Sequence, residues 1–270
     1  MPNSNIGILF SSHQTLKHME PIYALIRNRA RQIVSGFPVP DFYLDFSQAN
    51  QSSRHLVETD PILADLKLIV AEQIENDFGH GMEHAIKVTI DAGTLMMIEG
   101  RNAGYDKGFN ERRVLLAQCA GLLHDIKRKH ENHAIRGAES AMKILKSFPF
   151  LPSEIEDVCQ AIRNHEAFKS TVAINTLEGT LVSNCLYDAD KFRWGPDNFY
   201  YTVWDMVSFF KIPLSKFMEK YPKGMEGLAE IKSTFRTDTG KRYGPQFIDI
   251  GLDIGKELFE VIQTEFANWI

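Results

Sequence analysis

Cysteine, long apolar runs and strand-like alternation are all scarce in this 270-residue chain. The three cysteines, Cys119, Cys159 and Cys185, stand far apart in apolar stretches, which predicts reduced core residues and argues against a disulfide or thiolate site. No segment approaches the roughly 20 apolar residues that cross a bilayer, and the N-terminus lacks a basic region leading into an apolar one. We therefore expect a cytoplasmic protein with no membrane partner.

An excess of positive charge is also missing. Lys and Arg total 30 against 35 Asp and Glu, which gives a formal net charge of −5. This balance argues against extended nucleic-acid binding, whereas a small anionic substrate remains compatible with it. The chain also lacks the Gly-x-x-x-x-Gly-Lys-Ser/Thr loop that cradles nucleotide phosphates, so chemistry driven by ATP is not expected. These features leave the oligomeric state open.

Helical periodicity dominates, so we predict an all-α fold. With 44% hydrophobic residues, the chain can bury one large core. Ser153 and Glu156 have the spacing of a capping box. Proline predicts an extended connection over 37–45, and glycine predicts a loop over 100–110. The stretch 237–245 is predicted to be either a surface turn or the N-terminus of a helix that binds an anion. Helices are predicted over residues 22–34, 61–75, 82–96, 111–123, 134–146, 153–165, 177–188 and 245–268.

Six of the nine histidines lie between His80 and His165. His80 and His84 are four residues apart and would share a face of a helix, a spacing compatible with two ligands of one metal ion. Because glycines flank His80, it can also precede the helix, and both side chains can instead be surface or capping residues. The spacing alone leaves these interpretations open.

The doublet His124-Asp125 ends the apolar run 114–123, where unpaired polar groups cost several kcal/mol. On a regular helix the two side chains point about 100° apart, so both reach one ion only at a helix end or between helices. The alternative is a capping aspartate beside a core histidine. Further nitrogen and oxygen donors come from His84, His165 and the acidic pair Asp188 and Asp190. Together with the doublet they form a donor set without thiolate, which suits Mn, Fe, Co, Ni, Mg or Zn, with one or two ions per chain.

The order of these residues resembles the HD-domain superfamily of metal-dependent phosphohydrolases. The family's signature is a histidine, a His-Asp doublet and a distant aspartate, all directed at a metal from an all-helical core. His84 matches the first histidine because Lys87-Val88 follows it, as is typical of the family. Asp190 matches the terminal aspartate, and Asp188 is its competitor. The resemblance implies that His84, His124, Asp125 and Asp190 are metal ligands.

A second metal site is implied in the same way. The stretch His130 to Glu139 resembles the family segment after the doublet, where members with two metals use histidines from this segment and the next helix. That implicates His133 and His165, although His133 could equally be an ordinary first-turn residue. The resemblance implies an HD-type metal-binding core over residues 61–195 and does not explain the flanks. We expect residues 1–60 to be an N-terminal extension and residues 196–270 to be a C-terminal helical extension that packs on the core.

The implied function is a metal-dependent phosphohydrolase that acts on a small phosphorylated metabolite, expected to be a nucleotide, by attack of metal-bound water on phosphorus. Asp125 would bind metal and orient that water. Lys127 and Arg128 follow the doublet closely enough to bind a phosphate. His80 would stand at the mouth of the site, as in some family branches.

Several alternatives stay open. The enzyme could be a phosphodiesterase of a cyclic or signalling nucleotide, or an oxygenase with two irons. The chain could also be a non-catalytic, metal-stabilised sensor or partner-binding module. Arg163 and Lys191 are additional candidates for phosphate contacts, and the aromatic residues over 194–204 either stack a base or fill the core.

Overall fold

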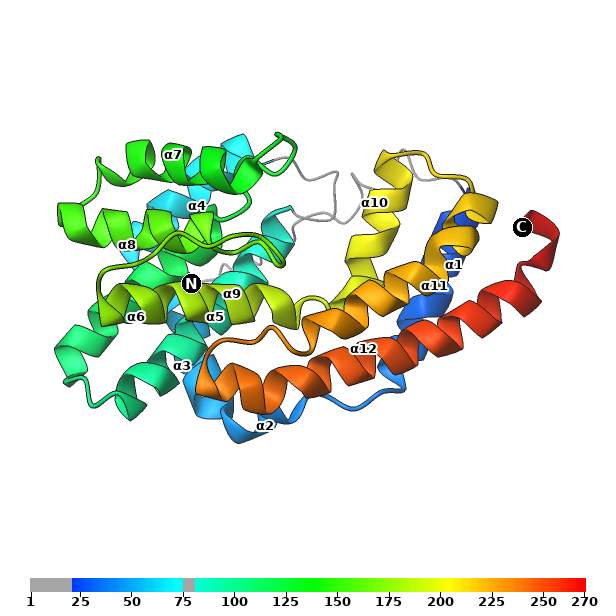
Figure 1. Ribbon diagram of the computed structural model, residues 1–270, viewed down its shortest axis with the longest axis horizontal. Helices are drawn as coiled ribbons and strands as arrows, with labels where there is room; N and C mark the ends of the chain where they lie inside the picture. Colours follow the sequence, from blue (N-terminus) through cyan, green and yellow to red (C-terminus); the bar gives the residue numbers. More distant parts are fainter. Residues whose placement is uncertain (1–20, 75–80) are drawn as a thin grey trace, which may run out of the picture.

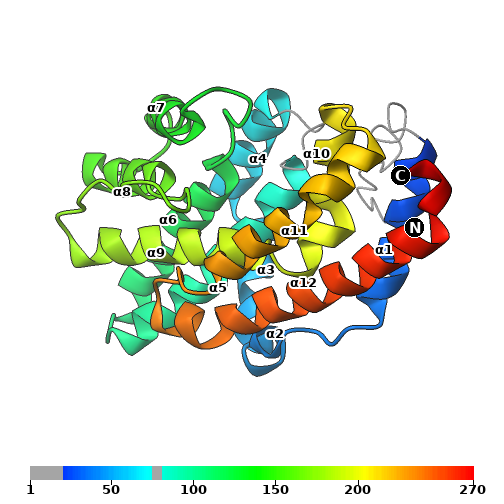
Figure 2. The ribbon, with the colours of Figure 1, turned by 45° about the vertical axis from the view of Figure 1, so that its right-hand side comes forward.

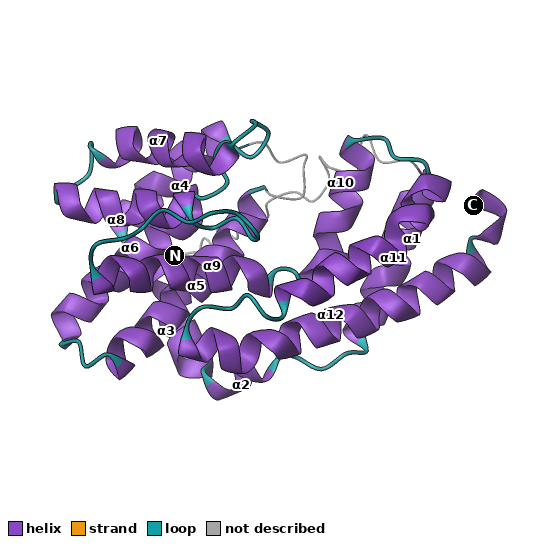
Figure 3. Cartoon of the chain, in the orientation of Figure 1, coloured by secondary structure: helices purple, strands orange, loops and turns teal. Residues whose placement is uncertain are grey.

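The computed structural model describes residues 21–74 and 81–270, and all regular structure within these ranges is helical (Figure 3). The predicted all-α fold is confirmed. None of the described helices combines the length and the apolar character needed to cross a lipid bilayer. The α-helices are α1 (Pro21–Ser35), α2 (Asp41–Asp45), α3 (Ser47–Thr59), α4 (Pro61–Gln73), α5 (Met82–Asn102), α6 (Lys107–Leu123), α7 (His133–Leu145), α8 (Pro152–Arg163), α9 (Leu177–Phe192), α10 (Val203–Phe209), α11 (Leu214–Ile231) and α12 (Asp238–Glu265).

Helices α5, α6 and α9 form the centre of the fold (Figure 1). Most residues of α5 are buried, and α6 is buried from Val114 to its end apart from the partly buried Leu115, as expected for helices that are apolar on nearly every side. Helices α7 and α8 pack on α6 and α9, while α3 and α4 cover α5 and α6. Buried polar side chains of the central helices, such as Asp91 and Gln118, are therefore hydrogen-bonded to other parts of the protein.

The remaining helices extend the molecule to one side (Figures 1 and 2). Helix α12 contacts α5 and α9 near its start and α1 further along. The Tyr23 hydroxyl of α1 donates a hydrogen bond to the Ile212 carbonyl at 2.7 Å, which ties α1 to the segment between α10 and α11. Trp204 is fully buried, so part of the aromatic stretch forms core. The proposed domain limits at 60 and 195 stay predictions.

The stretch 237–245 is not a surface turn but the beginning of α12. Thr237 is the N-cap residue, and its hydroxyl accepts a hydrogen bond from the Gly240 amide at 2.8 Å. Gly240 is required by packing, because a Cβ there would collide with the Asp188 carboxylate. The glycines and proline that suggested a turn are thus accommodated in a helix whose start is stabilised by a distant residue.

Three other boundaries differ from the predictions. The proline-rich stretch 37–45 is extended only to Pro40, after which the short helix α2 begins. The expected loop 100–110 shrinks to 103–106, because Asp106 accepts a hydrogen bond from the Phe109 amide and starts α6 early. Helix α8 begins at Pro152, and Glu154 rather than Glu156 makes the reciprocal capping contact, with the Leu151 amide at 2.8 Å.

Gly121 sets the separation of α5 and α6. A Cβ at this position would lie 2.6 Å from the Thr89 Cα and 2.9 Å from the Thr89 nitrogen, so the two backbones can approach only where α6 has glycine. We expect Gly121→Ala to lower the free energy of unfolding by about 1–3 kcal/mol, measured by urea titration, because one backbone must move.

Gly108→Ala is the matched control, since the nearest atom to a Cβ there is the Asp106 Oδ1 at 3.7 Å. Its expected effect is neutral or stabilising by less than about 1 kcal/mol. Equal stability of the two variants would contradict the close-approach argument.

Candidate metal centre

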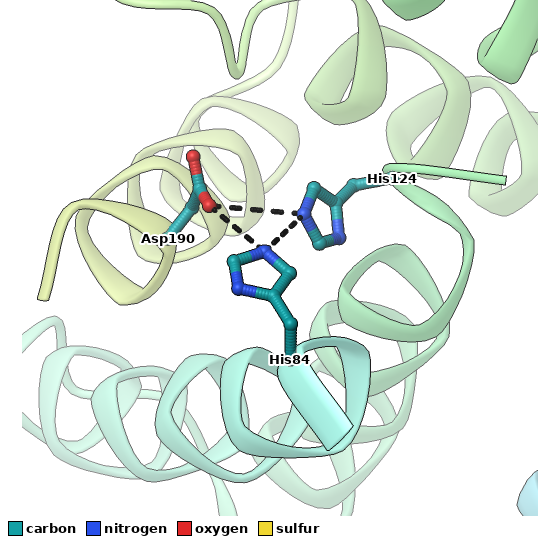
Figure 4. A group of neighbouring side chains, drawn as sticks. All are labelled: His84, His124 and Asp190. Carbon is teal, nitrogen blue, oxygen red and sulfur yellow. Dashed lines mark hydrogen bonds and ion pairs between the residues drawn. The ribbon is translucent and has the colours of Figure 1, made fainter. Parts of the chain in front are cut away.

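Three polar side chains converge from three helices at the centre of the fold (Figure 4). His84 lies in the first turn of α5, His124 directly follows α6, and Asp190 lies near the end of α9. The two Nε2 atoms are 3.2 Å apart. The Asp190 Oδ1 lies 3.3 Å from the His84 Nε2 and 3.7 Å from the His124 Nε2. One ion could therefore contact all three atoms.

A second group of donors lies beside the first. It consists of Asp125, His133 at the start of α7 and His165 just after α8, and its three donor atoms lie within 4.8 Å of one another. The His133 and His165 Nε2 atoms are 3.3 Å apart. Asn132 enters α7 in the left-handed region with φ 54°, a conformation that asparagine tolerates better than most residues. The turn at Asn132 thereby directs His133 into the protein.

Asp125 connects the two groups. Its Oδ2 lies 3.4 Å from the His124 Nε2 and 3.8 Å from the His84 Nε2, while its Oδ1 lies 3.5 Å from the His165 Nε2 and 3.7 Å from the His133 Nε2. Helix α6 ends at Leu123, so the doublet stands in a turn instead of on a regular helix. This is the geometry in which adjacent residues can face one centre.

Two of the imidazoles are held in a defined tautomer. The His124 Nδ1 lies 2.8 Å from the Gly121 carbonyl oxygen, and the His165 Nδ1 lies 2.6 Å from the Ile162 carbonyl oxygen. A carbonyl only accepts, so each Nδ1 carries the hydrogen and each Nε2 can present a lone pair to its group. Metal-binding histidines are commonly oriented in this way. The residues present thus fit a divalent ion held by nitrogen and oxygen.

The structure separates the two candidate aspartates of α9. Asp190 is directed at His84 and His124, whereas Asp188 is fully buried and accepts hydrogen bonds from the start of α12. The Arg236 and Thr237 amides donate to Asp188 at 2.8 Å, and the Thr237 hydroxyl donates at 2.7 Å. Burial outweighs the opposing effect of these hydrogen bonds and raises the pKa of Asp188 to about 6. Asp188 is therefore a helix-capping carboxylate.

Lys191 supports Asp190 from the next position. Its side chain is only 3% exposed, and its Nζ donates to the Asp190 Oδ2 at 2.6 Å. Burial raises the pKa of Asp190, but the Lys191 ammonium and the two imidazoles outweigh burial and hold the pKa well below its usual value. Asp190 is thus ionised, as a ligand of a cation must be.

The cations that follow the doublet occupy different positions. Lys127 is partly exposed, and Lys129 is exposed with its Nζ 4.9 Å from the centre of the Phe209 ring. Arg128 turns back into the second group, where its Nη1 lies 2.7 Å from the His133 Nε2 and 3.8 Å from the Asp125 Oδ1. Burial and the Arg128 charge lower the pKa of His133 to about 3, so this imidazole is neutral. His80 lies outside the described residues.

The cysteines take no part in either group. Cys119, Cys159 and Cys185 are free and buried, as predicted for core residues, and burial raises the pKa of each thiol. Arg128 and Lys191 were expected only as phosphate contacts, and no sequence pattern indicated their contacts with His133 and Asp190. Lys191 directly follows Asp190 and Arg128 comes three residues after Asp125, and only the fold directs both side chains to the two groups of donors.

A known protein family matches the part of the chain that carries these residues. No curated protein shows a significant sequence match. A solved structure from an uncultured Thermotogales bacterium, described as a predicted HD superfamily hydrolase, shares 25% sequence identity with this chain at a TM-score of 0.44, over 80% of this chain and 98% of the other. The family model of the HD domain matches residues 81–195, which include His84, the doublet and Asp190. The resemblance of residues 81–195 to the HD domain is thus confirmed.

Proposed function

We propose that this chain is a metal-dependent phosphohydrolase that acts on a small phosphorylated metabolite. The observation that carries the proposal is the convergence of His84, His124 and Asp190 on one centre, with the Asp125 carboxylate beside it. The HD domain over residues 81–195 supports a hydrolase. Burying two imidazoles and two carboxylates against one another costs free energy, and a divalent cation bound between them would offset that cost.

In the proposed reaction, His84, His124, Asp125 and Asp190 hold a divalent ion. When bound, this ion supplies a water acidified toward neutral pH and polarises a phosphoryl oxygen. Asp125 accepts a hydrogen bond from the attacking water and so orients it toward phosphorus. Neither a serine nor a cysteine nucleophile is needed, and the buried thiols with raised pKa are unsuited to that role.

The phosphate contacts are assigned to basic residues. Arg128 reaches the centre from the turn after the doublet, and its planar guanidinium can bind two phosphoryl oxygens. Lys127 is the second candidate from that turn. Lys191 offers an additional ammonium, because its one hydrogen bond to Asp190 leaves further N–H groups for an oxygen of the substrate.

A nucleotide is the proposed class of metabolite. Trp194 is 36% exposed, and its ring centre lies 5.6 Å from the Lys191 Nζ. An aromatic ring next to a phosphate-binding ammonium is suited to stacking a base while the phosphate reaches the centre. Tyr200 and Tyr201 are partly buried and lie further along the same stretch. A cyclic or signalling nucleotide would present the same two features, so a phosphodiesterase activity is the alternative.

Metal dependence is the first test. We expect chelation to lower hydrolysis of p-nitrophenyl phosphate by at least about a hundredfold, because the ion supplies both the activated water and charge stabilisation. Adding Mn, Co, Ni or Mg should restore the rate. Parallel assays with bis-p-nitrophenyl phosphate separate the phosphomonoesterase from the phosphodiesterase.

The sensor alternative makes the opposite prediction in the same assay. It would show no turnover with any of the metals, while added metal would raise the melting temperature. That combination of results would overturn the proposed hydrolase.

A further inference from the structure

The second group of donors already contains a cation. The Arg128 Nη1 lies 2.7 Å from the His133 Nε2, well within hydrogen-bond distance, and 3.8 Å from the Asp125 Oδ1. An arginine side chain only donates, so the His133 Nε2 must accept with its lone pair. A metal ion at this group would need that same lone pair. The guanidinium and a second ion therefore compete for one atom.

We infer that Arg128 takes the place of a second metal ion, so that the chain holds one ion tightly, at His84, His124 and Asp190. This inference rests on the proposed metal centre and adds the number of ions and the reason for it. Arg128 supplies fixed positive charge beside Asp125, at the group where Asp125, His133 and His165 would otherwise hold a second ion. In the first group, the Lys191 ammonium binds the Asp190 Oδ2, while the Asp190 Oδ1 faces the two imidazoles.

The local chain geometry favours this arrangement. Arg128 and Asp125 are three residues apart in the turn after α6, and His133 follows five residues after Arg128 at the start of α7. The Arg128 side chain is 30% exposed and that of His133 is 11% exposed, so the guanidinium enters from the solvent side and covers the imidazole. Arginine cannot release its proton to make room for a metal. A second ion would have to displace it.

The substrate would bind at a centre that consists of one metal ion and one guanidinium. A phosphoryl oxygen bound between the ion and the guanidinium would be neutralised on both sides, as in a centre with two ions. Unlike an ion, Arg128 cannot be removed by a chelator. The number of ions that bind therefore depends on one side chain, which makes the inference open to direct measurement.

The test is a titration of the chelator-treated, full-length protein with Mn²⁺ in a calorimeter, with bound manganese counted by elemental analysis after gel filtration. We expect one tightly held ion in the wild type and two in Arg128→Ala. Repulsion by the guanidinium should weaken the second ion in the wild type by at least about a hundredfold. Arg128→Lys should bind the second ion more weakly than Arg128→Ala, because it keeps the charge.

Two controls locate the second ion. Arg136→Ala removes an exposed arginine of α7 whose Nη1 lies 3.4 Å from the His130 Nδ1, and it should keep one ion. Adding His165→Ala to Arg128→Ala should return the count to one, because it breaks the second group. Circular dichroism checks that every variant is folded.

The outcomes are distinct. Two tightly bound ions in the wild type, or one ion in both the wild type and Arg128→Ala, would overturn the role of Arg128 and leave the proposed hydrolase standing. No bound ion in the wild type would overturn the metal centre itself, and with it both proposals.

Discussion

Asp125→Ala is expected to hydrolyse phosphoesters about a thousandfold more slowly than the wild type, or at the background rate, and to lose its bound metal. Asp125 is the residue whose two oxygens face both groups of donors, at 3.4 Å from the His124 Nε2 and 3.5 Å from the His165 Nε2. The apolar surfaces of α5, α6 and α9 are unchanged, so the helical circular dichroism spectrum should persist. Initial rates with Mn²⁺ and elemental analysis measure the two losses.

Asp253→Ala is the control for Asp125→Ala. Asp253 is exposed on α12, so its removal should change neither the rate nor the metal content. Asp125→Ala with the metal content of the wild type would remove Asp125 from the centre. Asp190→Ala should behave like Asp125→Ala, because Asp190 supplies the ligand from α9.

Asp188→Ala is expected to act on stability and not on metal binding. It leaves the Arg236 and Thr237 amides and the Thr237 hydroxyl without their buried acceptor at the start of α12. We expect the free energy of unfolding to fall by about 2–4 kcal/mol, because each unsatisfied buried donor costs about 1–3 kcal/mol and local relaxation recovers part of the loss. Urea titration followed by circular dichroism measures the change.

Asp188→Asn provides a graded control. Its amide keeps one acceptor oxygen, so it should lose less stability than Asp188→Ala. Comparison with Asp190→Ala, two residues away on the same helix, separates the two roles. Loss of metal in Asp188→Ala with unchanged stability would mean that the roles of the two aspartates are reversed.

Apolar periodicity was enough to predict most of the helices. It located α4, α6, α7 and α9 to within a few residues, because their buried faces repeat every three or four positions. The prediction failed where glycine and proline were interpreted as evidence of a loop or a turn. At 237–245 the chain is helical because Asp188, about 50 positions earlier, accepts hydrogen bonds from the helix start, and no local pattern reports such a partner.

The candidate centre was predicted in part. The family resemblance indicated His84, His124, Asp125 and Asp190, and the fold brings their side chains together. The choice between Asp188 and Asp190 depended on the contact between α12 and α9, and the sequence does not indicate this contact. The inward turn of Arg128 depends on the exact path between α6 and α7, so its contact with His133 could not be foreseen.

The most direct test of the metal centre is an anomalous difference map from a crystal of the wild-type protein grown with Mn²⁺. We expect one strong peak within about 2.0–2.3 Å of the Nε2 atoms of His84 and His124 and of the Oδ1 of Asp190. The absence of a peak at this position, or a strong peak only elsewhere, would contradict the proposed metal centre.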